Sequence, residues 1–398
     1  MTRHLSKSVQ ILRPSGIRRY FDIAATVDDV VTLGIGEPDF VTPAHIVDAG
    51  AQSLNNGLTG YTSNAGIPEL RAAISAQVEQ RYGLRYSPEK EVLVTVGVSE
   101  ALFLALKILL DPGDEALVVE PCFVANPALV QTAGGVPVMV PTSVHNDFQV
   151  TRAELEARVT PRTKAILLSY PSNPTGAALT REHMLEVAQV AEEYDLVVIS
   201  DEIYERLVYD IEHINFASLP NMYERAIVLS GMSKSYAMTG WRVGYVTAPA
   251  AFTEAMYKIH QYLIMSAPTT GQVASLQAIC HGEDDVESMR REYDRRRKLI
   301  VKGFNELGLT CFEPRGAFYA FPSITATGMD DEAFCEALLQ EERLALIPGS
   351  AFGESGRGFV RASYATSEAN ILEALDRLER FLMKRGLAQR AKAPVFAA

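Results

Sequence analysis

Between Glu91 and Pro249, short apolar runs alternate with longer segments in which apolar residues recur every three or four positions. The runs are EVLVTVG, EALVVEP, VPVMVPT, TKAILLSYP, LVVISDEIY and AIVLSG, and GWRVGYVTAP reads as a further strand. Segments such as SEALFLALKILL and TREHMLEVAQVAEEYD have helical periodicity. Nearly continuous Val, Ile and Leu strands between helices predict an α/β protein with a mainly parallel sheet covered on both faces.

After Pro249 the pattern changes to long helices, AAFTEAMYKIHQYLIM and TGQVASLQAICHG. The last hundred residues combine strands, around TCFEPRGAFYAFPSI and FVRASYA, with the helices DDEAFCEALLQEERL and EANILEALDRLERFLMKRG. We therefore predict a large α/β domain over residues 46–285 and a small α+β domain over residues 286–398. Residues 1–45 are predicted to be an N-terminal segment that contributes to the small domain.

The basic segment MRREYDRRRKLIVKGF, from Met289 to Phe304, alternates charged and apolar residues at helical spacing. This spacing predicts the solvated face of a long helix. The formal net charge is −12, which argues against a nucleic-acid partner because the phosphates would be repelled.

Composition excludes several classes of protein. No apolar run is long enough to cross a bilayer, so no membrane partner is expected, and MTRHLSKSVQILRPSG lacks the apolar core of a secretory signal. We predict a cytoplasmic protein, in which the four cysteines are free thiols. The seven histidines are scattered without a ligand-spacing motif, so a protein-bound metal is not expected.

Polar or glycine-bearing residues follow five of the predicted strands. In open α/β sheets, ligands bind beyond the carboxyl ends of the strands, so these residues are expected to meet at one site. They are Gly97-Val98-Ser99, Pro121-Cys122-Phe123, Asn173-Pro174-Thr175-Gly176, Asp201-Glu202-Ile203-Tyr204 and Ser233-Lys234.

Lys234 allows more than one chemistry. A phosphate-binding loop requires a glycine spacing that is absent before Lys234, and LGIGEPDF lacks the third glycine of a dinucleotide-binding motif. A lysine can instead form a Schiff base with an aldehyde, most often that of pyridoxal phosphate. Such a site needs a carboxylate for the ring nitrogen, a donor for the phenolic oxygen, an anion pocket for the phosphate and an aromatic side chain on the ring.

The segment SGMSKSYAMTGWRVGY, which contains Lys234, resembles the lysine signature of class I/II aminotransferases. These are pyridoxal-phosphate enzymes of the aspartate aminotransferase fold, known as fold type I. Six further segments resemble the family's motifs in the family's order: LGIGEPDF, YTSNAGIPELR, TVGVSEAL, YPSNPTG, SDEIYERLVY and FVRASYA. The resemblance covers nearly the whole chain and implies that the large domain binds pyridoxal 5′-phosphate.

The resemblance implies roles for the residues around the cofactor ring. Lys234 would bind the cofactor aldehyde and, once displaced by the amino acid, act as general base and acid. Asp201 would pair with the ring nitrogen, because a buried carboxylate needs a cation. Tyr204 and Asn173 would donate to the phenolic oxygen, and Phe123 would stack on the ring.

For the phosphate, the resemblance points to Val98 and Ser99 at a helix start, where free N–H groups favour an anion. Ser99 could also be an ordinary N-cap. Ser233 and Arg242 would add contacts. Tyr61 would reach the phosphate from the neighbouring subunit, which implies a homodimer.

For the substrate, Arg361 would bind the α-carboxylate with its planar guanidinium, together with Asn173. Gly36 would allow the backbone to approach the same carboxylate.

Three departures from the family pattern concern Gly231, Phe123 and Ser99. Gly231 replaces a phosphate-binding serine of some members, and Phe123 replaces a tryptophan or tyrosine. Ser99 stands where some aspartate-specific bacterial members have a lysine, and RPSGIRRYFDIA is closer to members that accept aromatic or varied amino acids. These features favour broad or aromatic specificity, with aspartate or alanine still possible.

The predicted activity is amino-group transfer from an L-amino acid to a 2-oxo acid such as 2-oxoglutarate, in a ping-pong cycle. A C–S or other β-lyase of the same fold is the nearest alternative, because it would use the same lysine and aspartate. An aminotransferase-like regulatory module is a remote alternative, since the family motifs begin near Leu33 and leave little room for a DNA-binding domain before them.

Overall fold

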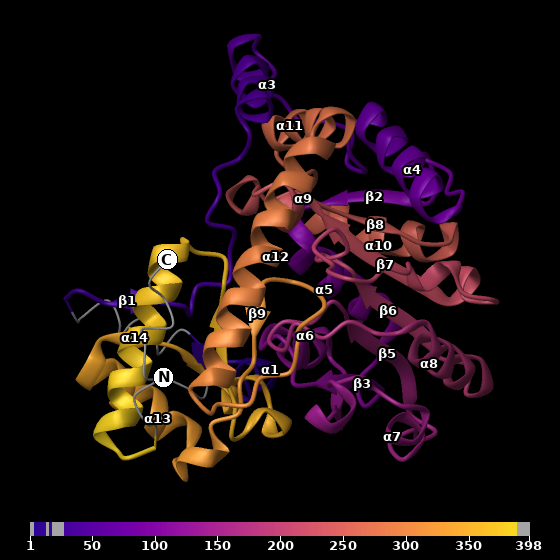
Figure 1. Cartoon of the computed structure of the whole chain (residues 1–398). Helices are drawn as coiled ribbons and strands as arrows, with labels where there is room; N and C mark the ends of the chain where they lie inside the picture. Colours follow the sequence, from indigo (N-terminus) through magenta and orange to yellow (C-terminus); the bar gives the residue numbers. More distant parts are fainter. Residues whose placement is uncertain (1–3, 13–15, 18–27, 388–398) are drawn as a thin grey trace.

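A computed structural model describes residues 4–12, 16–17 and 28–387, and Figure 1 shows its arrangement. The segment RPSGIRRYFDIA, used above to favour broad specificity, lies largely outside the described residues. The chain forms a large sheet with helices on its faces and a smaller unit of helices and short strands beside it (Figure 1).

The large sheet has seven strands in the order β2-β8-β7-β6-β5-β3-β4. Only β8 runs antiparallel to its neighbours, so the predicted mainly parallel α/β sheet is confirmed. The strands are β2 (Val92–Thr95), β3 (Glu115–Glu120), β4 (Val136–Pro141), β5 (Thr163–Ser169), β6 (Val197–Asp201), β7 (Ala226–Gly231) and β8 (Gly244–Thr247).

Successive residues of the central strands point to opposite faces, and both faces are covered. In β5, Ala165 and Leu167 belong to a core with α5, α6 and α10, whereas Ile166 and Leu168 face a core that includes α8. This explains why the strands read as continuous apolar runs. These helices are α5 (Gly97–Leu109), α6 (Ala125–Ala133), α8 (Arg181–Glu193) and α10 (Ala250–Leu263).

A third core lies at the β2 edge of the sheet. It joins apolar residues of β2 to the helices α3 (Ala44–Asn55), α4 (Pro68–Tyr82) and α11 (Thr269–His281). These helices form the top of the molecule in Figure 1.

The smaller unit contains a three-stranded antiparallel sheet in the order β11-β12-β9. Strand β1 pairs in parallel with β10, so this segment joins the C-terminal unit. The division at residues 45 and 285 remains a prediction. The elements are β1 (Val31–Thr32), β9 (Tyr319–Ala320), β10 (Leu344–Ala345), β11 (Ile347–Pro348), β12 (Val360–Ser363), α13 (Asp331–Glu342) and α14 (Glu368–Lys384).

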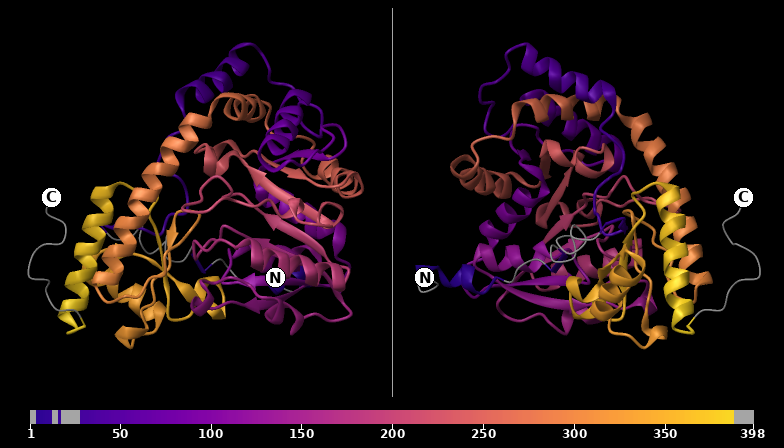
Figure 2. Two further views of the ribbon diagram at one scale, coloured as in Figure 1. Left: turned by 45° about the vertical axis from the view of Figure 1, so that its right-hand side comes forward. Right: turned by 90° about the vertical axis from the view of Figure 1, so that its left-hand side faces the viewer.

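The long helix α12 (Glu283–Glu306) runs from the α11 region to the smaller unit (Figure 2). The sequence predicted a solvated face for its basic segment, and this prediction is wrong for two arginines. Arg297 is fully buried and Arg296 nearly so. Arg297 donates to Asp294, Asp210 and the carbonyl of Pro314, so its charge is paired inside the protein.

Short elements complete the described chain. They are α1 (Lys7–Gln10), α7 (Arg152–Glu156), α9 (Met232–Ser235) and the 3₁₀ turns Val144–Asn146, Phe216–Ser218, Tyr223–Arg225, Thr239–Trp241, Thr325–Thr327, Gly349–Phe352 and Glu354–Gly356. The four cysteines are unpaired, as predicted. Among the described helices, none combines the length and the apolar character needed to cross a membrane.

Candidate active site

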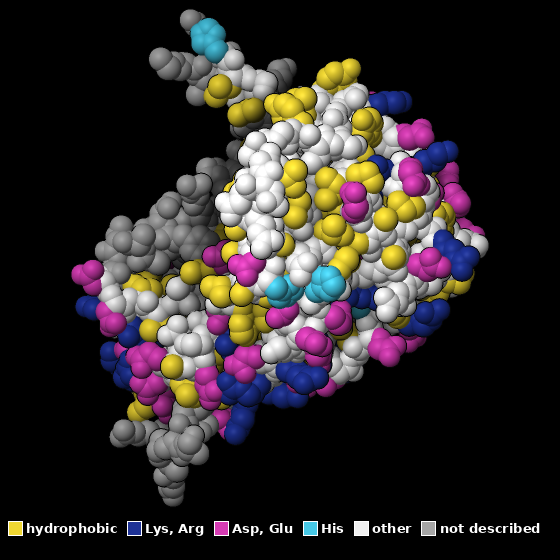
Figure 3. All heavy atoms as spheres, turned by 90° about the horizontal axis from the view of Figure 1, so that it is seen from above, with side chains coloured by type: hydrophobic (Ala, Val, Ile, Leu, Met, Phe, Trp, Pro, Cys, Tyr) yellow, Lys and Arg dark blue, Asp and Glu magenta, His cyan; other side chains and the backbone are white. Residues whose placement is uncertain are grey.

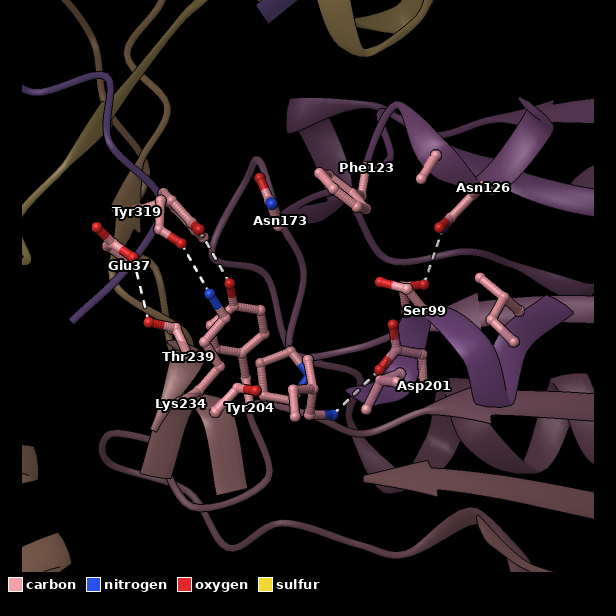
Figure 4. Close-up of a pocket in the computed structure, with 18 of the residues that line it drawn as sticks. Glu37, Ser99, Phe123, Asn126, Asn173, Asp201, Tyr204, Lys234, Thr239 and Tyr319 are labelled. Carbon is pink, nitrogen blue, oxygen red and sulfur yellow. Dashed lines mark hydrogen bonds between the residues drawn. The ribbon is translucent and has the colours of Figure 1, made fainter. Parts of the chain in front are cut away.

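A cavity of about 360 Å³ lies where the carboxyl ends of the parallel strands meet the smaller unit (Figure 4). In Figure 4, Tyr319 and Glu37 approach from the left and Phe123 and Asn126 from the right. Its wall includes Ile17, Gly36, Glu37, Val98, Ser99, Leu102, Phe123, Asn126, Leu129, Asn173, Asp201, Tyr204, Ser233, Lys234, Thr239, Tyr319, Arg242 and Arg361.

Lys234 lies on the short helix α9, directly after β7. Its Nζ donates to the carbonyl oxygen of Gly36 at 2.8 Å. Burial lowers the pKa of this amine to about 8, with Arg361 and Arg242 adding to the fall while Glu37 opposes it. An appreciable fraction of the amine is therefore neutral near physiological pH, as a nucleophile requires.

Asp201 ends β6 and faces the same cavity. Burial raises the pKa of its carboxyl to about 7, against a hydrogen bond from the backbone N–H of Ile203 at 3.2 Å. Among the described residues, no ion pair with Asp201 is seen. A cationic ligand group beside Asp201 would offset the cost of burying this carboxylate.

Tyr204 and Asn173 have side-chain partners that orient them. The hydroxyl of Tyr204 lies 2.9 Å from that of Tyr319. The amide oxygen of Asn173 accepts from Nη1 of Arg361 at 2.8 Å. This contact leaves the N–H groups of the Asn173 amide as donors for a ligand.

Val98 and Ser99 lie in the first turn of α5, and the N-cap is Val96. Ser99 is therefore not the N-cap. Glu100 accepts from the N–H of Val96 at 2.5 Å. A Cβ on Gly97, whose φ is +71°, would lie 2.7 Å from Nη2 of Arg242. The arginine thus lies against the helix start, and both favour an anion.

The absence of a side chain at Gly231 has a steric reason. A Cβ there would lie 2.8 Å from the Cα of Gly244 and 2.9 Å from the carbonyl oxygen of Val243. A serine at this position would separate β7 from β8. The neighbouring Ser233, 8% exposed, does line the cavity.

Arg361 is buried on β12, and its guanidinium is only partly satisfied by the protein. Nη2 donates to the carbonyl oxygen of Gly34 at 2.6 Å, but the buried Nε has no partner among the described residues. Burial lowers the pKa of this guanidinium. An anionic ligand is the natural complement of a buried arginine with free donors.

Gly36, Phe123 and Tyr61 differ in their placement. A Cβ on Gly36 would lie 2.7 Å from the hydroxyl of Tyr319. A larger residue at position 36 would therefore clash with Tyr319. Phe123 lines the cavity and is 39% exposed. Tyr61 does not line it and is 81% exposed on the surface.

Glu37, Asn126, Thr239 and Tyr319 also line the cavity, and they are not among the residues predicted from the sequence. Glu37 and Thr239 lie inside motifs quoted above, so their position in the motifs could have indicated them. The sequence predicts a strand that contains Tyr319, but it does not indicate that this strand lies beside Arg361.

Comparisons with known proteins agree with this geometry. The family "Aminotransferase class I and II" matches residues 28–378. An aspartate aminotransferase of Pyrococcus abyssi is 45% identical over 96% of this chain and 99% of its own. An aromatic-amino-acid aminotransferase of Thermococcus litoralis is 42% identical over the same shares. The crystal structure of an aromatic aminotransferase from Pyrococcus horikoshii has a TM-score of 0.89 at 43% identity, covering 94% of this chain and 100% of that one.

Proposed function

The chain belongs to the class I and II aminotransferases, and we propose how its cavity serves their reaction. It is an amino-acid aminotransferase that uses pyridoxal 5′-phosphate, with the fold of the aspartate aminotransferases. The observation that carries the assignment of residues is that a half-buried, partly neutral lysine and a half-buried carboxyl, which has no ion pair among the described residues, face one cavity.

The residues present fit the cofactor. Asp201 is a half-buried carboxyl with no ion pair among the described residues, and the ring nitrogen of the cofactor would supply a cation when protonated. The α5 start with Arg242 is suited to the phosphate, with Ser99 and Ser233 as further donors. Asn173 and Tyr204 would hold the phenolic oxygen, and Phe123 would cover the ring.

When bound, pyridoxal phosphate supplies an aldehyde that takes up the amino group and a ring that accepts an electron pair. Asp201 would keep a proton on the ring nitrogen. Lys234 would hold the cofactor, and its amine, once freed by the amino acid, would move the proton of the substrate Cα. Arg361 binds the α-carboxylate and sets the orientation of the substrate.

Reduction with borohydride tests the role of Lys234. The holoenzyme should keep a cofactor mass on the peptide that contains Lys234, and Lys234→Ala should lose both this adduct and turnover. Retention of amino transfer by Lys234→Ala, or an adduct on another lysine, would overturn the assignment. Transfer is distinguished from elimination by conversion of the cofactor to its amine form without release of ammonia.

We propose that amino acids with uncharged side chains are the preferred donors. Ile17, Leu102, Phe123 and Leu129 make an apolar part of the cavity wall. The described cations of the cavity are Lys234, Arg242 and Arg361, and each already has a proposed partner. No described cation of the cavity is therefore left to bind a carboxylate on the donor's side chain, and Glu37 would repel one.

A panel of donors tests this specificity. Phenylalanine, tyrosine and leucine should give a higher kcat/KM than aspartate, and a preference for aspartate would contradict it. Because 2-oxoglutarate also brings a second carboxylate, it should be compared with pyruvate as the acceptor.

We also propose a homodimer with Tyr61 at the shared site. Exposed apolar side chains gather on the upper face in Figure 3, and Leu58, Tyr61, Tyr262 and Leu263 are among the exposed hydrophobic residues. Their two segments are linked, because Thr269 donates to the carbonyl of Gly60 at 2.8 Å. Exposed apolar surface of this kind favours association. Light scattering should give twice the chain mass, and Tyr61→Phe should weaken cofactor binding. The cytoplasmic location remains a prediction.

A further inference from the structure

Tyr319 is a cavity residue that the assignments above do not use. It lies on β9 and pairs with Ser363 of β12, the strand that carries Arg361. The guanidinium carbon of Arg361 lies 4.6 Å from the centroid of the Tyr319 ring. The Tyr319 hydroxyl lies 2.9 Å from that of Tyr204. One side chain therefore touches both the arginine proposed for the substrate and the tyrosine proposed for the cofactor.

The hydrogen bond between the two tyrosines joins the two parts of the molecule. Tyr204 follows β6 of the large sheet, whereas Tyr319 belongs to the three-stranded sheet. Tyr319 is fully buried and Tyr204 is 5% exposed. The Tyr319 hydroxyl also lies close to the backbone of Gly36, where a Cβ would be only 2.7 Å away. Its position is thus confined from two sides.

The contact between the two hydroxyls constrains which of them donates. A tyrosine hydroxyl has one hydrogen to donate and can accept from a second group. If Tyr204 donates its hydrogen to a ligand oxygen, it must accept from Tyr319. Hydrogen bonds in such a chain polarise one another, so Tyr319 would make Tyr204 a stronger donor.

Burial keeps both hydroxyls neutral despite the charged groups around the pair. Burial raises the pKa of Tyr204 well above its ordinary value and raises the pKa of Tyr319 as well. Arg361 lowers the pKa of both tyrosines, and Asp201 raises that of Tyr204, but burial is the larger effect. The Nζ of Lys234 lies 5.8 Å from the Tyr204 ring centroid. Both tyrosines are therefore available as hydrogen-bond donors.

We propose that Tyr319 is a positioning residue with two functions. Its hydroxyl directs the hydrogen of Tyr204 toward the phenolic oxygen of the cofactor, and its ring holds the guanidinium of Arg361 in place. This inference rests on the proposed function, in which Tyr204 and Arg361 bind cofactor and substrate.

The hydroxyl is tested by the pH at which the visible absorbance of the lysine-bound cofactor changes. A donor to the phenolic oxygen favours its deprotonated form, so a weaker donor moves this transition to higher pH. Tyr319→Phe should raise it by roughly 0.3–1 pH unit, less than Tyr204→Phe does. The double variant should have the same transition pH as Tyr204→Phe alone. Without the Tyr204 hydroxyl, the Tyr319 hydroxyl has no group through which it can act on the cofactor.

The ring is tested separately by the KM for the amino acid. Tyr319→Phe should keep this KM within about twofold, whereas Tyr319→Leu should raise it roughly 3- to 30-fold, because the cation–π contact is lost. Tyr364→Phe is the matched control, because Tyr364 is also buried and donates to the carbonyl of Ala317 at 3.2 Å. It should change neither readout.

Specific results would overturn the inference. An unchanged transition in Tyr319→Phe, or an equal shift in the presence and absence of the Tyr204 hydroxyl, rules out action through Tyr204. An equal shift in Tyr364→Phe indicates a general effect of packing. Thermal unfolding of each apoprotein shows whether a variant is folded. If borohydride fixes the cofactor on Lys234 but these shifts are absent, only the inference fails and the proposed function stands.

Discussion

Arg361 and Asn173 share a hydrogen bond of 2.8 Å, in which the guanidinium Nη1 donates to the amide Oδ1. The bond orients the arginine, whose buried Nε has no acceptor among the residues that the structure describes. A lysine at position 361 would keep the charge but lose the planar arrangement of donors. Arg361→Lys should raise the KM for the amino acid roughly 10- to 100-fold, with little change in the Kd of the cofactor.

The control for this variant is Arg357→Lys, a change four residues earlier at a side chain that is about half exposed and pairs with Glu354. It should leave both constants unchanged. Equal losses of cofactor and substrate affinity in Arg361→Lys would mean that the arginine supports the fold.

The ionised carboxylate of Asp201 should lower the unfolding free energy of the apoprotein. The pKa of its folded-state carboxyl is raised, so the unfavourable effect of ionisation develops as the pH rises from about 4 to about 7 and is complete above that. Asp201→Asn should therefore stabilise the apoprotein at pH 8 by roughly 1–3 kcal/mol, a figure reduced because the carboxyl is partly open to the cavity. The same variant should lose about 10²-fold or more in kcat.

Denaturant unfolding of the two apoproteins at pH 5 and pH 8 measures this effect. The advantage of Asp201→Asn should shrink at the lower pH, where the wild-type carboxyl is protonated. An advantage of the same size at both values would show that ionisation is not its cause.

The rate at which the apoprotein captures pyridoxal phosphate should follow the ionisation of Lys234. Because the neutral amine attacks the aldehyde and burial lowers its pKa to about 8, the rate should rise with pH and level off above about pH 9. Stopped-flow absorbance measures this rate. A blocked free lysine, whose side-chain amine has an ordinary pKa, should continue to gain rate up to higher pH, and the same profile for both amines would contradict the prediction.

Gly97→Ala should weaken cofactor binding. A methyl group there would meet Nη2 of Arg242 at 2.7 Å and displace the guanidinium from the start of α5. We expect a loss of roughly tenfold or more in cofactor affinity. Gly83→Ala is a close control, because Gly83 has a φ of +70° but open space around it. Gly83→Ala should lower the unfolding free energy by about the same backbone contribution, roughly 1 kcal/mol, without changing the affinity for the cofactor.

Arg297→Met should destabilise the protein, because the variant removes a fully buried guanidinium that pairs with Asp210 and Asp294. The loss in unfolding free energy should be about 2–4 kcal/mol. The adjacent Lys298→Met removes only an exposed ion pair with Asp294 and should cost less than about 0.5 kcal/mol. Similar losses in both variants would contradict the burial argument.

The strands were predictable because their residues are buried on both faces, as Ile166 and Leu167 show by facing opposite cores. Such strands read as unbroken apolar runs. The helices α3 and α4 were not predicted. In α4 the buried Leu70, Ile74 and Val78 recur every four positions, but the exposed Ala72 and Ala76 weaken the contrast between the two faces of the helix.

The buried Arg297 was also missed, because two of its partners, Asp210 and Pro314, lie outside its helix and far from it in the sequence. In the cavity, the large-sheet residues could be proposed from motifs that follow strands. Tyr319 could not, since its importance depends on the pairing of β9 with β12, which joins residues more than forty positions apart. Long-range pairing of short strands leaves little trace in local sequence.

The turn from β7 through α9 into β8 brings Lys234 and Arg242 to the same cavity. The chain reverses once between them, and Gly231 lies against Gly244 where the two strands meet. The proposed covalent and ionic attachments of the cofactor are therefore carried by one short segment, residues 231–244. Side-chain changes elsewhere in the cavity wall can alter which amino acid is accepted. An insertion or deletion within this segment would instead shift Lys234 relative to Arg242, so that both could no longer reach one cofactor molecule. An engineer who grafts new specificity onto this protein should treat the length of this segment as fixed.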